Sequence, residues 1–84
     1  MQKTYAVEIR KVAMKFIAKQ TPAQQKRILR AIYALPDGDT KRMEGTAANH
    51  YRLRVGDYRI LYEIHENILL IVVVNAGNRG DVYK

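Results

Sequence analysis

Apolar and polar residues along the chain follow two different periods, which predict strands at its ends and helices between them. Residues 4–9 alternate between apolar and polar side chains, as expected for a first strand. Residues 10–20 carry apolar side chains at the three- and four-residue spacing of an amphipathic helix. A second helix follows, with Thr21 as its N-cap, Pro22 at its first position and Gln24 completing a capping box. A Pro-Asp-Gly sequence then ends this helix.

The second half of the chain has the pattern of a sheet. Residues 37–50 are mostly polar and are expected to form a loop. Beyond them, Gly56-Asp57 is a two-residue hairpin signal between two alternating segments, and a second turn at residues 65–67 leads to an apolar run. Strands are therefore predicted at residues 51–55, 58–64 and 68–74.

This order of elements, β-α-α-β-β-β, predicts an α+β domain. Two N-terminal antiparallel helices are expected to pack on one face of a mostly antiparallel four-stranded sheet, with room for a short final strand at residues 81–83. The chain has 84 residues, so a single domain over residues 1–84 is expected. A domain of this size holds one core, which favours a surface groove over a deep pocket for a large cofactor.

The predicted hairpin gathers Arg52, Arg54 and Arg59 on the face opposite the core side chains, with Arg54 directly across from Arg59. Like charges in such a position destabilise a sheet. Solvation, or neutralisation by Glu63 and Glu66, explains any one of these arginines. A site for a multiply charged anion explains the whole group, since arginine suits bidentate contact with phosphate. An exposed sheet with basic residues is one way to hold single-stranded RNA.

The chain is basic, with 15 Lys and Arg against 8 Asp and Glu and a net charge of +7. Residues 10–30 carry seven of the basic residues and no acidic one. Such a field attracts nucleic acid, an anionic membrane or an acidic protein, although a solvated helix face explains it equally well. The chain has no cysteine, no signal-peptide pattern, and no apolar run long enough to cross a bilayer. We therefore expect a cytoplasmic protein.

Few residues have side chains suited to proton transfer. His50 and His65 are interpreted as solvated residues at a loop end and a turn, and a role as proton carrier stays open for either. Tyr83 near the terminus is suited to stack on a base, to act as an acid or base, or to dock the last residues. No phosphate-binding glycine loop, paired-histidine metal spacing or cysteine nucleophile is present. No metal and no small-molecule cofactor is therefore expected.

The segment YRLRVGDYRILYEI, the apolar strand after it and the closing GNRGDVY resemble the RelE/ParE toxin superfamily, and within it the RelE-like messenger-RNA interferases. TPAQQKRILRAI and LPDGDTKRMEG are similar to the family's second helix and following loop. The resemblance covers nearly the whole chain. It implies a toxin of a type II toxin–antitoxin system that cleaves messenger RNA in the ribosomal A site, with a cognate RelB-like antitoxin as partner. The reaction it implies is a metal-free attack of the 2′-hydroxyl on the adjacent phosphate.

Residue by residue, the resemblance implies a site of five side chains. Arg59 and Arg79 are expected at the phosphate and the transition state, Arg52 and Arg54 on the RNA backbone, and Tyr83 at the 2′-hydroxyl. The best-known RelE members carry lysines where this chain has Arg52 and Arg54. Because arginine effectively cannot lose its proton, the role of base passes to Tyr83 or to groups of the ribosome.

Two other functions remain open. The ParE branch of the same fold implies an inhibitor of DNA gyrase that acts by protein binding, and the fold alone does not choose between the branches. The full set of arginines with Tyr83 favours RNA, since a gyrase inhibitor does not need it. The third possibility is a basic RNA-binding module without chemistry.

Overall fold

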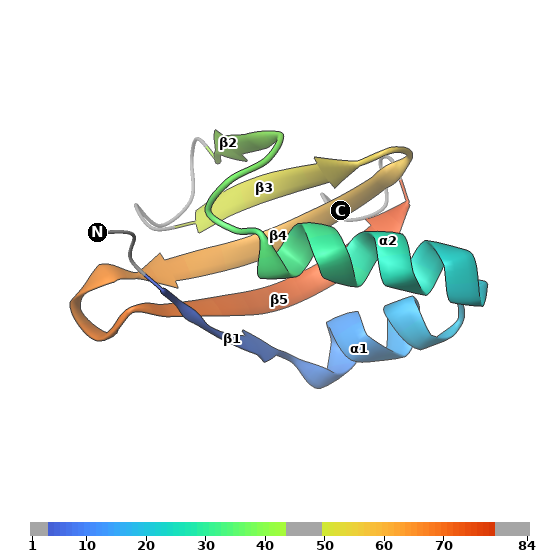
Figure 1. The fold of residues 1–84 in the computed structure, drawn as a ribbon, viewed down its shortest axis with the longest axis horizontal. Helices are drawn as coiled ribbons and strands as arrows, with labels where there is room; N and C mark the ends of the chain where they lie inside the picture. The colour runs from blue at the N-terminus through green and yellow to red at the C-terminus, as the bar shows by residue number, and fades with distance from the viewer. Residues whose placement is uncertain (1–3, 44–49, 79–84) are drawn as a thin grey trace.

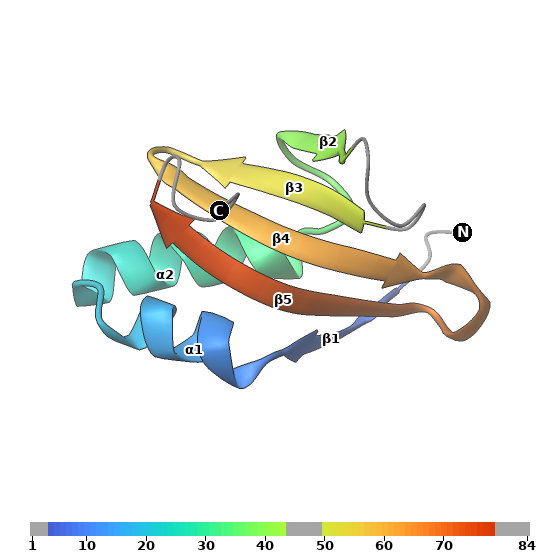
Figure 2. The ribbon, with the colours of Figure 1, turned by 180° about the vertical axis from the view of Figure 1, so that it is seen from behind.

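The computed structural model describes residues 4–43 and 50–78 of the chain. The strands are β1 (Ala6–Ile9), β2 (Thr40–Arg42), β3 (His50–Val55), β4 (Tyr58–His65) and β5 (Leu70–Asn78), the helices are α1 (Lys11–Ala18) and α2 (Pro22–Tyr33), and η1 (Glu66–Ile68) is a short 3-10 turn. Both helices lie against one face of a sheet with the strand order β1-β5-β4-β3-β2 (Figure 1). Figure 2 shows the other face, which neither helix covers.

The predicted α+β class and the placement of the two helices are confirmed, whereas the predicted number of strands is wrong. The described residues form a five-stranded sheet, because β2 lies inside the segment expected to be a loop. β2 pairs with β3 in antiparallel fashion, and β1 pairs with β5 in parallel at the other edge. The strand expected at residues 81–83 lies outside the described residues.

The second helix begins as the sequence predicts. Pro22 is its first residue, and Thr21 Oγ1 accepts a hydrogen bond from the backbone N–H of Gln24 at 3.3 Å. The reciprocal half of the capping box is not made, since Gln24 Oε1 is buried and has no hydrogen-bond partner. One side-chain bond therefore caps this helix.

A single hydrophobic core lies between the helices and the sheet. Its fully buried large side chains come from both helices and from three strands: Ile17, Ile28, Ile32, Leu53, Ile60, Tyr62, Ile71 and Val73. Full burial of one such aliphatic side chain contributes about 1.5–3 kcal/mol. Neither helix in the described part of the chain combines the length and apolar character needed to cross a membrane.

The last strand differs most from its predicted position. It was expected at residues 68–74, but β5 begins at Leu70 and continues to Asn78. Ile68 belongs instead to the 3-10 turn and is 61% exposed. A register shift in the pairing with β4 accompanies the longer strand: Leu61 faces Asn75 while Tyr62 faces Val73. Because of this one-residue shift, Gly77 lies opposite Arg59.

Candidate nucleic-acid interface

The three hairpin arginines alternate along β3 and β4 with residues of the core, which places them on the face of the sheet opposite the helices. Figure 2 shows the backbone of this face. The arginines' neighbours Leu53 and Ile60 point the other way, into the core. In the register of β3 and β4, Arg54 lies directly opposite Arg59, as the predicted hairpin requires. The turn between them places Gly56 at a φ of +58°, a conformation that glycine adopts without steric cost.

Arg59 is not solvent-exposed, contrary to the expectation of a bare arginine face. Its exposed fraction is only 8%. Arg59 lies on β4, the central strand of the sheet, so strands flank it on both sides. Its Nη1 makes a long hydrogen bond of 3.4 Å to the carbonyl oxygen of Tyr58. The fixed positive charge of Arg59 therefore lies near the middle of the sheet face that carries the arginines.

Arg54 has a carboxylate partner that sequence analysis did not identify. Its Nε donates to Asp39 Oδ2 at 2.9 Å, and its backbone N–H donates to the carbonyl oxygen of Asp39 at 2.9 Å. Both side chains are about half exposed, at 47% and 56%. An exposed pair of this kind contributes about 0.2–1 kcal/mol. The Asp39 carboxylate therefore offsets part of the repulsion between Arg54 and Arg59.

Arg52 differs from the other two because one of its donors is buried without an acceptor. Its Nε is buried and has no hydrogen-bond partner among the described residues. Arg52 lies between Lys41 of β2 and Leu61 of β4 in the strand register. A buried donor without a partner costs about 1–3 kcal/mol, and more for a charged group.

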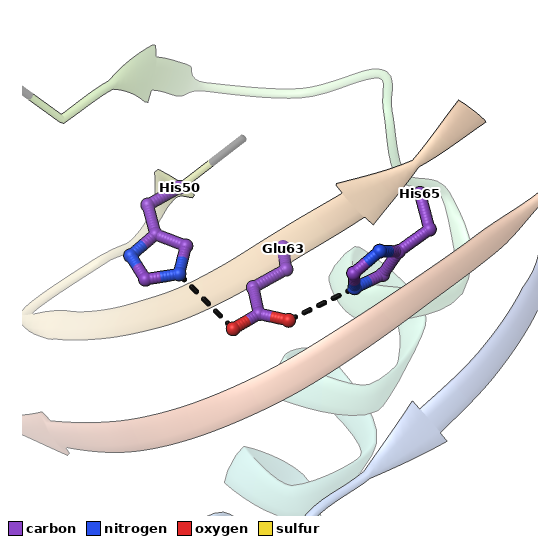
Figure 3. Close-up of polar contacts among 3 residues, drawn as sticks. All are labelled: His50, Glu63 and His65. Atoms are coloured by element: carbon purple, nitrogen blue, oxygen red, sulfur yellow. Dashed lines mark hydrogen bonds and ion pairs between the residues drawn. The ribbon is translucent and has the colours of Figure 1, made fainter. Parts of the chain in front are cut away.

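The described residues include a cluster that sequence analysis missed. The Glu63 carboxylate hydrogen-bonds to Nε2 of His50 at 3.0 Å and to Nε2 of His65 at 2.9 Å (Figure 3). The hydrogen bond from His65 lowers the pKa of the Glu63 carboxyl below its usual range. Burial opposes this shift, whereas the hydrogen bond and charge of His50 add to it. Both histidines were interpreted as solvated; their side chains are 36% and 34% exposed, and each also has a carboxylate partner that the sequence did not predict. The hairpin register was the available signal, since it places His50 opposite Glu63.

A second basic feature lies at the edge of the sheet beside α2, and its lining includes Arg54. It is a groove of about 520 Å³ between α2 and the end of β3. The Arg27 guanidinium lies close to Gly56, with Nη2 2.9 Å from the position that a Cβ would take there. The charged residues that line the groove are Lys26, Arg27, Arg30, Arg54, Asp37 and Asp39. Three basic residues of α2, Lys26, Arg27 and Arg30, therefore line this groove.

Arg79 and Tyr83, the remaining predicted site residues, lie outside the described residues. The structure brings Arg52, Arg54 and Arg59 together on one face and adds His50, Glu63 and His65 to the same face. The described part of this face therefore combines fixed positive charge with groups that exchange protons.

The fold is that of the small toxins of toxin–antitoxin complexes. The complex RelBE2 from Mycobacterium tuberculosis matches with a TM-score of 0.77 and 21% identity, over 90% of this chain and 99% of the other. The RelE–RelB complex from Pyrococcus horikoshii OT3 matches with a TM-score of 0.75 and 30% identity, over 94% and 99%. The RelB–RelE complex from Methanococcus jannaschii matches with a TM-score of 0.71 and 25% identity, over 90% and 94%.

Comparison by sequence identifies the family. None of the curated proteins matches the chain significantly. The model of the family described as the ParE toxin of the type II toxin–antitoxin system parDE matches residues 3–83. The chain therefore belongs to the ParE toxin family, within the RelE/ParE superfamily of type II toxins. The predicted resemblance to this superfamily is confirmed.

Proposed function

We propose that this toxin is a ribosome-dependent endoribonuclease that cleaves messenger RNA in the A site and so inhibits translation in the cytoplasm. The observation that carries the proposal is the group of three guanidiniums on neighbouring positions of β3 and β4. Phosphate oxygens of an RNA strand are acceptors suited to guanidinium donors. A RelE toxin is the relative that matches at 30% identity, which supports RNA as the target.

The proposed reaction follows from what clustered guanidiniums can do. The O2′–P bond forms as the P–O5′ bond breaks, which leaves a 2′,3′-cyclic phosphate and a 5′-hydroxyl. The extra negative charge of the pentavalent phosphate is stabilised by fixed positive charge. In the proposal Arg59 and Arg79 take this role, Arg52 and Arg54 hold the RNA backbone, and Tyr83 orients the 2′-hydroxyl. Neither a metal ion nor an organic cofactor takes part in the proposed steps.

Primer extension on messages from cells that express the toxin tests this function. The wild type is expected to produce discrete breaks inside translated codons, and Arg52→Ala is expected to produce far fewer. Lys15→Ala is the matched control, because it removes one positive charge from exposed α1 and should leave the breaks unchanged. Intact messages with the wild-type toxin would contradict the proposal.

Gyrase inhibition is the second candidate, and the family match to the ParE toxin favours it. In that case the toxin binds a protein and has no need of the arginine group. A supercoiling assay with purified gyrase separates the two functions. Loss of supercoiling with uncut messages would support gyrase inhibition, whereas normal supercoiling with cut messages would exclude it.

We also propose a cognate RelB-like antitoxin as the partner. The three matching structures described above are complexes of a toxin with RelB or of the RelBE type, and the net charge of +7 favours an acidic partner. The test is a short reading frame beside the gene whose product copurifies with the toxin and restores growth. Failure of that product to bind the toxin would contradict the proposal of a RelB-like antitoxin.

A further inference from the structure

Three titratable side chains form one hydrogen-bonded cluster on the face of the sheet that neither helix covers, called the open face below. His50 begins β3, while Glu63 and His65 lie near the end of β4. Each histidine uses Nε2 and contacts a different oxygen of the carboxylate, Oε2 for His50 and Oε1 for His65 (Figure 3). The carboxylate therefore fixes both imidazole rings at once. Within residues 4–43 and 50–78, no group of His, Cys, Asp and Glu side chains is arranged to hold a metal ion.

The cluster adjoins the arginine group. His50 and Arg52 are two residues apart on β3, so both point to the same face with their Cα atoms about 7 Å apart. In the strand register Glu63 lies opposite His50, and Leu61 lies opposite Arg52. His65 is farther away, because it follows Glu63 at the end of β4. His50 is thus the histidine of the cluster nearest to the arginines along the strands.

The proposed cleavage needs a group that removes the proton from the 2′-hydroxyl, and arginine is a poor candidate. Guanidinium keeps its proton at any pH that a folded protein tolerates. Histidine is the side chain whose ordinary titration falls near neutral pH. When one ring nitrogen of a neutral histidine donates its N–H to a carboxylate, the other ring nitrogen is left as a proton acceptor.

We infer that His50 is the general base of the proposed RNA cleavage and that Glu63 positions its ring. The inference rests on the proposed function and names the proton acceptor for that reaction. Nε2 of His50 donates to Glu63, and Nδ1 takes the proton from the 2′-hydroxyl as the O2′–P bond forms. The P–O5′ bond breaks at the same time, and the leaving 5′-oxygen takes a proton from water.

The exposure of the two side chains fits these roles. The side chain of His50 is 36% exposed, which allows contact with a ribose, whereas that of Glu63 is 19% exposed. Glu63 is also bonded by both histidines, which leaves it little freedom to reach a substrate. It therefore acts as a positioning residue, and His65 completes the hold on its carboxylate.

The test is single-turnover cleavage of messenger RNA on programmed ribosomes. His50→Gln keeps an N–H donor for Glu63 but offers no basic nitrogen, so its cleavage rate should fall on the order of 100-fold or more. His50→Ala should lose a similar factor, and added imidazole should restore part of its rate. Glu63→Gln should lose less than either. Cosedimentation should show wild-type ribosome binding for all three variants.

The outcomes separate this inference from the proposed function. If the wild type cuts no message, both fail. If the wild type cuts and His50→Gln cuts at the same rate, the inference alone is overturned. A loss in His50→Ala that imidazole does not restore, or that weaker ribosome binding explains, also overturns it. Rescue by imidazole with binding unchanged supports a proton-transfer role, which a merely structural residue would not show.

Discussion

Replacement of Gly56 by alanine tests the turn that sets Arg54 opposite Arg59. Gly56 has a φ of +58°, where a Cβ costs about 1–2 kcal/mol. Alanine also restricts the unfolded chain, which returns about 0.4–1 kcal/mol. The new Cβ would lie 2.9 Å from Nη2 of Arg27, but this is the end of a flexible, exposed side chain and can move away. The expected loss in the free energy of unfolding is therefore about 1 kcal/mol.

Urea unfolding followed by circular dichroism measures this loss. The midpoint should fall while the dependence of the free energy on urea stays unchanged, and the melting temperature should drop by about 4–8 °C for a domain of this size. Asp57→Ala is the matched control, because Asp57 lies in the same turn without a positive φ and is exposed. It should stay within about 0.5 kcal/mol of the wild type. Wild-type stability of Gly56→Ala, or an equal loss in Asp57→Ala, would refute the reasoning.

Two further substitutions test contacts on the open face and beside it. The lowered pKa of Glu63 means that its ionised form stabilises the fold above the carboxyl's unfolded pKa, and that this stability disappears as the pH falls through the folded pKa. Glu63→Gln should therefore be about 1 kcal/mol less stable than the wild type at pH 6. In urea titrations this gap should close as the pH falls below the carboxyl's unfolded pKa and through its lower folded pKa. A gap that does not change with pH would argue against the cluster. Asp39→Asn removes the exposed ion pair with Arg54 and should lower the free energy of unfolding by about 0.2–1 kcal/mol in low salt. Thermal melting measures this loss, which should be smaller at high ionic strength. A loss that does not depend on salt would contradict an ion pair.

The hairpin was predictable because a two-residue turn fixes the register of everything beyond it. Once Gly56-Asp57 is the turn, Arg54 must face Arg59 and His50 must face Glu63. The start of α2 at Thr21 was predictable because its cap involves only residues that are close in the chain. These features depend on residues close in the chain or on a register that one turn determines.

The edges of the sheet were not predictable from local pattern. β2 consists of Thr40, Lys41 and Arg42, which have no apolar alternation and become a strand only by pairing with β3. The last residues of β5 include Gly77 and two asparagines, which have low strand propensity, yet they pair with β4. Backbone hydrogen bonds to a distant strand outweigh propensity at both places.

Side-chain directions within the site were also beyond sequence analysis. Arg54 turns to Asp39, which is 15 residues away and enters from the segment before β2. Arg59 is only 8% exposed although it lies on the face of the sheet that no helix covers. Long side chains have many rotamers, so their partners follow from the assembled sheet and not from the spacing of residues.

The central claim is that a messenger RNA strand reacts through its own 2′-hydroxyl while it lies on this arginine face. The most direct measurement is cleavage on programmed ribosomes of a message that carries one 2′-deoxynucleotide at the mapped break. The account predicts that this message stays intact, that the matched ribonucleotide message is cut, and that the upstream fragment ends in a 2′,3′-cyclic phosphate. Equal cutting of both messages, or a fragment with a free 3′-hydroxyl, would contradict it.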